Sequence, residues 1–201
     1  MAIANAIPKV TMMLVASALL SGCFSHKVTP SLSLSAPPAQ PPVVGDYSLE
    51  VVGAERLNGP APVISTVCSA HSFQVDFAGR ASDEIATAFG KRWASLRPTS
   101  ENSPTPRKVT ATVEQASYHL MCGFAESGLG HCTGQAKVGI ALDVLSPKKT
   151  EAKLRTTVER RVRQENIVSC DKGGEVLSRA IQEATDGALS DLLARPELSR
   201  P

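Results

Sequence analysis

The feature that most restricts the fold is a long alternation of apolar with polar or small residues over residues 132–147, "CTGQAKVGIALDVLSP". The apolar side chains occupy every second position, at Ala136, Val138, Ile140, Leu142 and Val144. Successive side chains of a strand point to opposite faces, so this pattern predicts a strand with one buried face. A chain built around such a strand needs partner strands beside it and a second layer over the apolar face.

Residues 108–122 predict the neighbouring strand. Their apolar positions change parity part-way, from Val109, Ala111 and Val113 to Ala116, Tyr118 and Leu120. Such a slip predicts a β-bulge near Glu114 or Gln115. Similar alternation predicts a third long strand over residues 152–165 and shorter strands at residues 47–52 and 71–77. The inward positions of the third strand are Leu154, Thr156, Val158 and Val162.

Two segments have helical spacing instead. Residues 82–96 repeat large apolar residues every three or four positions, with Ser82 as the expected N-cap and Pro98 as the stop. The members of this repeat, all expected in the core, are Ile85, Phe89, Trp93 and Leu96. Residues 97–108 are rich in proline and short polar residues, and we expect a loop there.

A longer apolar stripe over residues 174–194 predicts the second helix, with Gly187 as a point of close packing. The stripe consists of Leu177, Ala180, Ile181, Ala184, Ala188 and Leu192. The resulting order of elements predicts an α+β fold: a mostly antiparallel sheet with two helices packed on one face, in a two-layer sandwich. The other sheet face is expected to be wet. Residues 47–201 are expected to form this single domain.

The N-terminus has the layout of a secretory signal over residues 1–22. Lys9 supplies the positive region, and Val10 to Leu20 form an apolar core of about 11 residues, too short to cross a bilayer as a helix. Residues 20–23, "LSGC", resemble the lipobox of bacterial lipoproteins. This resemblance implies that the signal is cut before Cys23, that Cys23 carries acyl chains and that the protein is lipid-anchored. Because Phe24 follows instead of an acidic residue, it also implies the outer membrane, with the domain facing the periplasm.

Residues 23–46 are expected to be the lipidated cysteine and a proline-rich tether. The segment carries Pro30, Pro37, Pro38, Pro41 and Pro42 among small polar residues. Such a composition favours polyproline II, which would give a semi-rigid spacer of at most ~70 Å at ~3.1 Å per residue. An alternative is a segment that becomes ordered against a partner.

Four cysteines follow Cys23, and they allow three sets of disulfide pairings. Cys122 and Cys132 flank a short loop between two expected hairpin strands, which favours a bridge between them. Cys68 then pairs with Cys170. An exported chain would reach an oxidising compartment, where disulfides persist.

Metal binding is the alternative for part of this cysteine set. The side chains of His119, Cys122, His131 and Cys132 could ligate zinc. Their spacing, however, matches no short zinc-knuckle pattern, and the thiols would have to stay reduced. We therefore expect disulfides and no metal.

Charge and composition exclude some classes of function. Without residues 1–22 the chain has 20 basic and 19 acidic residues, and aromatic residues make up 4% of the sequence. Nucleic-acid binding needs a concentrated positive field or stacking platforms, so no nucleic-acid partner is expected. The sequence has no nucleophile elbow, phosphate loop or metalloprotease helix. We therefore expect no enzymatic activity and no cofactor.

One charged cluster is a candidate contact site. Arg155, Arg161 and Arg163 fall on one face of the third long strand, and Arg160 falls on the other. Arginine makes bidentate bonds to phosphate and carboxylate, so the cluster could contact a lipid headgroup or an acidic protein. The alternative is an ordinary solvated sheet face whose arginines are balanced by nearby glutamates.

Several stretches together resemble a known family. They are the "LSGC" motif, "VTPSLSLSAPP", "VVGDYSLEVVGAERLNG", the helix end "FGKRW" and the terminal helix "LSRAIQEATDGALSDLL". In this order they resemble YajG-type outer-membrane lipoproteins and, more loosely, the small α+β lipoproteins that serve as transport auxiliaries. The resemblance implies a fold and a location. It implies no reaction, and Cys23 is the one residue to which it gives a role.

These observations predict a non-catalytic envelope lipoprotein that acts as a docking or accessory subunit of a membrane-associated assembly. Its partners would be outer-membrane lipid, through Cys23, and another envelope protein. The alternative function is a binding module for lipid or another hydrophobic ligand, held between the helices and the sheet.

Overall fold

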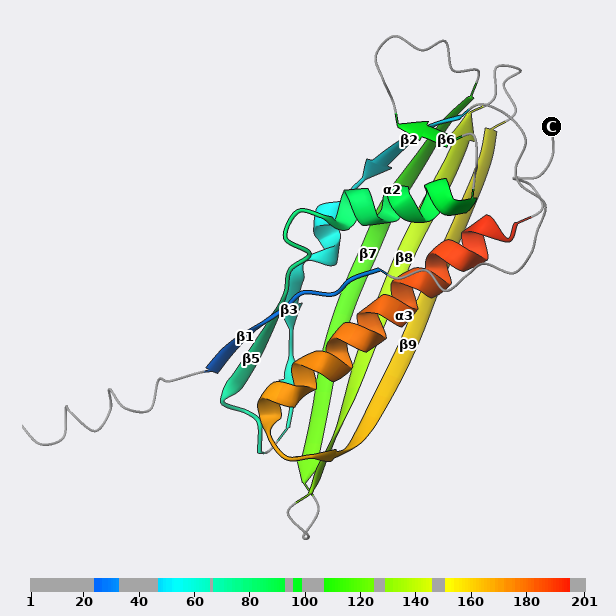
Figure 1. The fold of residues 1–201 in the computed structure, drawn as a ribbon. Helices are drawn as coiled ribbons and strands as arrows, with labels where there is room; N and C mark the ends of the chain where they lie inside the picture. Colours follow the sequence, from blue (N-terminus) through cyan, green and yellow to red (C-terminus); the bar gives the residue numbers. More distant parts are fainter. Residues whose placement is uncertain are drawn as a thin grey trace, which may run out of the picture.

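The computed structural model describes most of the chain after Cys23. The described ranges are residues 24–32, 47–65, 67–92, 96–98, 107–124, 129–145 and 151–195. Within them the chain forms an α+β domain in which two helices lie on one face of a long sheet (Figure 1). The fold class expected from the sequence is therefore confirmed.

Three long strands form the centre of this sheet. They are β7 (Arg107–Phe124), β8 (Gly130–Leu145) and β9 (Glu151–Ile167), and they make an antiparallel meander. The alternating residues of β8 that are fully buried are Ala136, Val138, Ile140 and Leu142. These pairings confirm the expected meander. One face of each long strand is apolar and has to be covered by another layer.

Short strands extend the sheet in the parallel direction. β2 (Tyr47–Val52) pairs in parallel with the first part of β7, and β6 (Leu96–Pro98) pairs in parallel with β2. β4 (Val63–Ile64) pairs in parallel with a later part of β7. The path through the sheet is β6-β2-β7-β8-β9, so β9 is an edge strand. Parallel pairing is possible here because a long connection that includes a helix returns the chain from β2 to the start of β7.

The expected bulge lies between Val113 and Gln115, where the register of β7 against β8 shifts. Arg56 lies in the 3-10 turn η1 (Ala54–Leu57), and its Nη1 donates to the backbone carbonyls of Val113 and the next residue, each at 3.1 Å. Gly53, before this turn, has φ 74°, and a Cβ on it would lie 2.7 Å from the Val113 carbonyl oxygen. The bulge is thus held by a turn that only glycine lets approach so closely.

A second sheet of three strands was not expected. β1 (Phe24–Val28) runs parallel to β5 (His71–Val75), and β3 (Gly59–Ala61) runs antiparallel to β5 on its other side. β5 is the strand predicted from residues 71–77, and its inward Phe73 and Val75 are buried.

The expectation of a tether that begins at residue 23 is wrong for residues 24–28, which form β1. The first five residues of the segment, Phe24–Val28, are a paired strand. The physical reason is that the prolines begin only at Pro30, so every residue of β1 keeps its backbone N–H for the ladder. Residues 33–46, with the other four prolines of that segment, and Cys23 lie outside the described residues.

The first helix, α2 (Ala81–Arg92), is shorter than expected and starts one residue earlier. Ser82 therefore lies inside the first turn and is not the N-cap, and Leu96 belongs to β6, where it pairs with Tyr47. Trp93 lies outside the described residues. The buried apolar residues of α2 are Ala81, Ile85, Ala88 and Phe89.

The loop expected at residues 97–108 is also shorter. Residues 97 and 98 belong to β6, and residues 107 and 108 belong to β7. Residues 99–106 lie outside the described part of the chain. Backbone pairing with β2 extends strand structure into both ends of this polar segment.

The second helix, α3 (Gly173–Leu193), packs across β8 and β9 (Figure 1). All six residues of the predicted stripe are fully buried. A Cβ on Gly187 would lie 3.1 Å from Cγ1 of Val158 and 3.3 Å from Nη2 of Arg160, so the expected close packing at Gly187 is confirmed.

The first turns of α3 also approach the sheet closely at Gly134 of β8. A Cβ there would lie 2.9 Å from both the Leu177 Cα and the Val176 carbonyl oxygen, which are backbone atoms of α3. A helix backbone cannot move away without shifting its whole stripe. Gly134 therefore sets how near the first turns of α3 lie to the sheet.

We expect Gly134→Ala to destabilise the domain by about 1–3 kcal/mol, because the added methyl group overpacks against backbone. Gly90→Ala is the matched control. Gly90 is exposed in α2, with nothing within 4 Å of an added Cβ, so alanine should stabilise that helix by up to about 1 kcal/mol. Urea unfolding of both variants measures the difference, and equal midpoints would contradict this account of Gly134.

Asp186 of α3 is a half-buried carboxyl on the side of α3 near α2. Its Oδ1 is buried and has no hydrogen-bond partner among the described residues. Burial raises the pKa of Asp186 to about 6, and the nearby Lys91 of α2 opposes this rise only in part. Ionised Asp186 is therefore a cost to the folded state near neutral pH.

We expect Asp186→Asn to stabilise the domain at pH 7–8 by about 1 kcal/mol, a value discounted for partial exposure. The cost of ionisation is absent below the unfolded pKa near 4 and appears as the pH rises through the folded pKa of about 6. The gain should therefore vanish at pH 4. Thermal melts across pH 4–8 check this, with Glu183→Gln, an exposed position of the same helix, as the control that should show no such trend.

Candidate functional site at the disulfide-linked end

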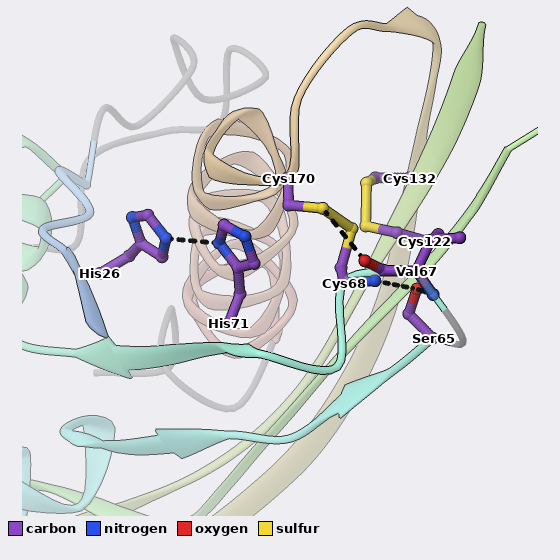
Figure 2. Close-up of a disulfide and its surroundings, with 8 residues drawn as sticks. All are labelled: His26, Ser65, Val67, Cys68, His71, Cys122, Cys132 and Cys170. Carbon is purple, nitrogen blue, oxygen red and sulfur yellow. Dashed lines mark hydrogen bonds between the residues drawn. A yellow bond between two sulfur atoms is a disulfide. The ribbon is translucent and has the colours of Figure 1, made fainter. Parts of the chain in front are cut away.

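Two disulfides lie close together at one end of the domain (Figure 2). Cys68 is bonded to Cys170 with the Cα atoms 5.7 Å apart, and Cys122 is bonded to Cys132 with the Cα atoms 4.2 Å apart. Both are the pairings predicted from the sequence. Cys122 and Cys132 face each other directly across β7 and β8, which is the hairpin geometry that the prediction assumed.

The Cys68–Cys170 bond joins two elements that are far apart in sequence. Cys68 precedes β5, and Cys170 begins the short turn η2 (Cys170–Lys172) that leads into α3. The hydroxyl oxygen of Ser65 accepts hydrogen bonds from the backbone N–H groups of Val67 and Cys68 at 3.2 and 2.9 Å. The disulfide ties the segment before β5 of the three-stranded sheet to the start of α3.

Stacked rings attach β1 to β5 at this end. Nε2 of His26 lies 2.7 Å from Nδ1 of His71, and the two rings are stacked with centroids 4.9 Å apart (Figure 2). Phe24 stacks on His71 and Phe73 stacks on His26, with centroids 5.1 and 4.9 Å apart. The backbone N–H of Phe24 also donates to the Ala70 carbonyl at 3.0 Å. The first residues of β1 are thus held against β5 from Phe24 onward.

Further contacts hold the other half of β1. Lys27 forms an ion pair with Asp76 at 2.7 Å, and the hydrogen bond from the Lys27 ammonium lowers the pKa of Asp76. Val28 is buried, and a Cβ on Gly174 of α3 would lie 3.4 Å from its Cγ2. β1 is therefore packed against α3 as well as paired with β5.

A groove of about 630 Å³ runs between β1 and the first turns of α3. Its lining is mainly polar and charged, and includes His26, Lys27, Asp171, Glu175 and Arg179. A hydrogen bond from Ser169 lowers the pKa of Asp171, and a hydrogen bond to Glu175 at 2.6 Å raises the pKa of the adjacent Lys172. Such a lining suits a polar partner more than a hydrophobic ligand.

The structure argues against the metal alternative. The thiols of Cys122 and Cys132 are used in a disulfide, so they cannot ligate zinc beside His119 and His131. In the described ranges, no three His, Cys, Asp or Glu side chains are grouped to hold a metal ion. The Nδ1 atom of His119 is buried and has no hydrogen-bond partner among those residues.

The arginine cluster lies along β9, on the sheet edge. Of its outward members, Arg161 pairs with Glu159 at 3.2 Å and Arg163 pairs with Glu165 at 2.6 Å. All these side chains are substantially exposed, so each pair contributes little to stability. Charged side chains on an edge strand also prevent pairing with other chains.

Arg155 makes a longer connection across the sheet. Its Nε lies 3.0 Å from Oε1 of Glu114 on β7, although β8 runs between them. Ala141 of β8 pairs with Arg155 and is 2% exposed. A small outward residue on the central strand thus leaves room for long side chains from both neighbours. Arg160 points to the helix side of the sheet, near Gly187. Contact of the arginine cluster with an anionic partner stays a prediction.

The contact between His26 and His71 is not predicted from the sequence. Phe24, His26 and Val28 alternate with polar residues in the pattern of a strand. That signal is only five residues long. His71 lies 45 positions after His26, so no local spacing brings the two histidines together.

Comparisons with known proteins find similarity in structure only. No protein-family model and no curated protein matches the chain. The structure is similar to Xanthomonas campestris protein XCC0632, which carries the family model DUF330, with 13% identity, TM-score 0.45, and coverage of 83% of this chain and 94% of that one. It is also similar to a minor lipoprotein from Acinetobacter baumannii, with 10% identity, TM-score 0.34, and coverage of 76% and 87%.

Similarity at this level identifies neither a family nor a function for this chain. The resemblance to YajG-type lipoproteins stays a prediction. Neither of the two helices in the described ranges is both long enough and apolar enough to cross a membrane.

We expect the two disulfides to differ in their contribution to stability. The Cys68–Cys170 bond spans 102 positions and the Cys122–Cys132 bond spans 10. Closing a longer loop restricts the unfolded chain more, so losing the first bond should cost about 5 kcal/mol and losing the second about 3 kcal/mol. Calorimetry on Cys68→Ala/Cys170→Ala and on Cys122→Ala/Cys132→Ala compares them directly. A larger loss from the second pair would contradict the loop argument.

Proposed function

We propose that this chain is a non-catalytic lipoprotein of the bacterial envelope, anchored through acyl chains on Cys23. It acts as a docking or accessory subunit for a membrane-associated assembly, on the periplasmic face of the outer membrane. One observation carries the proposal. Four of the five cysteines are paired with one another, so Cys23 has no cysteine left to pair with in its own chain.

The chemistry around Cys23 supports acylation. A small-residue motif, "LSGC", follows an apolar segment and ends at this cysteine. A free thiol there is available to form the thioether that carries a lipid. Several acyl chains on one residue would hold the protein on a membrane almost permanently, since each buried CH2 contributes roughly 0.8 kcal/mol.

Two disulfides also support an exported protein, because such bonds persist in oxidising compartments and are rare in the cytosol. The polar lining of the groove beside β1 favours a docking role over the alternative role of binding a hydrophobic ligand. Partner contact would use exposed polar surface, with the groove and the outward arginines of β9 as candidates.

The first test is metabolic labelling with palmitate. We expect label on the wild-type protein and none on Cys23→Ser, which should also keep its leader uncleaved. The Cys68→Ala/Cys170→Ala variant is the matched control, because it removes two other cysteines and should stay labelled. Label retained on Cys23→Ser would show that the anchor is elsewhere.

The docking role has a second readout. After extraction of the anchored wild-type protein in mild detergent, a stoichiometric protein should copurify with it. Copurification of a bound lipid without a protein would favour the alternative, a module that binds a hydrophobic ligand. Mass spectrometry of the purified material separates these two outcomes.

A further inference from the structure

Exposed apolar side chains gather at the disulfide-linked end. Scattered exposed apolar residues are normal on a protein surface, whereas a cluster of them marks an interaction site. Val168 is 73% exposed and Phe24 is 62% exposed. The large exposed apolar residues at this end, here called the apolar patch, are Phe24, Ile64, Val67, Leu129 and Val168.

The disulfides and the strand register place these residues together. Val67 precedes Cys68, and Val168 lies two positions before Cys170, so the Cα–Cα distance of 5.7 Å in that disulfide brings both to the same place. Leu129 precedes Gly130, whose register partner on β9 is the residue before Val168.

The rest of the patch is placed by β4 and β1. Ile64 of β4 pairs with Met121, next to Cys122. Phe24 bonds to Ala70, two positions after Cys68. In Figure 1 the start of β1, the start of α3, the end of β7 and the start of β8 all lie toward this same end of the molecule.

The position of the proposed anchor at Cys23 indicates that a lipid bilayer covers this patch. Consecutive Cα atoms are about 3.8 Å apart, so residue 23 lies beside Phe24 whatever its conformation. Because β1 is paired from Phe24 onward, no free chain separates Cys23 from the folded domain. A lipid on Cys23 therefore brings the bilayer to within a few ångströms of Phe24, the first residue of the patch. A protein partner on the patch would have to fit between the patch and the bilayer.

We propose that the apolar patch lies directly on the bilayer surface and sets the orientation of the domain on the membrane. This rests on the proposed acylation of Cys23. The side chains of the patch enter the boundary between headgroups and acyl chains, about 5–10 Å deep. Patch contacts too weak to hold a free domain suffice here, because the anchor gives them a local concentration in the millimolar range.

This orientation fixes what faces the periplasm. β8 runs away from the patch toward Leu145, so the end of the domain with β6 points away from the membrane. Along β9, Arg163 lies near the membrane and Arg155 lies eight residues further out, about 26 Å at 3.3 Å per residue. A protein partner that binds at the far end therefore meets Arg155 and not Arg163.

The test uses the acylated full-length protein in vesicles of phosphatidylethanolamine and phosphatidylglycerol. Trp93→Phe removes the single native tryptophan, and Val168→Trp places a reporter in the patch. We expect dibrominated lipids to reduce its fluorescence at least twofold. Leu145→Trp, at the opposite end of β8 and 44% exposed, is the matched control and should be quenched by less than a tenth.

Leu129→Trp is a second patch reporter, so the test does not depend on the folding of one variant. Flotation of the vesicles separates the two proposals. If the protein floats but the patch reporters are no more quenched than Leu145→Trp, the orientation is wrong while the anchor stands. If the protein does not float, both proposals fail. Unquenched reporters together with a concentration-dependent dimer would assign the patch to a second copy and overturn the membrane contact.

Discussion

The packing of α3 across β8 and β9 determines where every other part of this domain lies. The helix stripe fills the core, and Gly134 and Gly187 let it approach the sheet closely near its two ends. The start of α3 is also the attachment point for the smaller sheet, through Cys170 and through the contact of Gly174 with β1. Once α3 is placed, the direction of β1 is fixed, and so is the end of the domain at which Phe24 begins.

Local patterns predicted the long elements well. Alternation over 14 residues or more identifies a half-buried strand with little ambiguity, and a stripe of six apolar residues identifies α3. The parity slip even located the bulge beside Val113. What local patterns do not contain is the choice and direction of distant partners. The parallel pairs β2 with β7 and β1 with β5 join residues at least 45 positions apart. The energy of such a pairing depends on both strands, so neither strand's sequence alone predicts it.

The same division applies to the candidate site. The disulfides could be predicted because two cysteines flanked an expected hairpin, which left one choice for the other two. The arginines of β9 could be identified, but the role of Arg155 could not, because its partner Glu114 lies two strands away and depends on the small Ala141 between them. The contact between His26 and His71 could not be predicted, because neither histidine belongs to a local motif. The two rings stack only because β1 pairs with β5.

The position of β1 changes what the proline-rich segment can do. In sequence, residues 29–46 follow β1 and precede β2, so both of their ends are fastened to the domain. Such a segment cannot set the distance between an anchor at Cys23 and the folded domain. A long spacer between the anchor and the domain would let the domain reach partners far from the membrane. If Cys23 is anchored as proposed, the domain would be attached at its first residue and would stay near the membrane, with its orientation set through the pairing of β1 with β5.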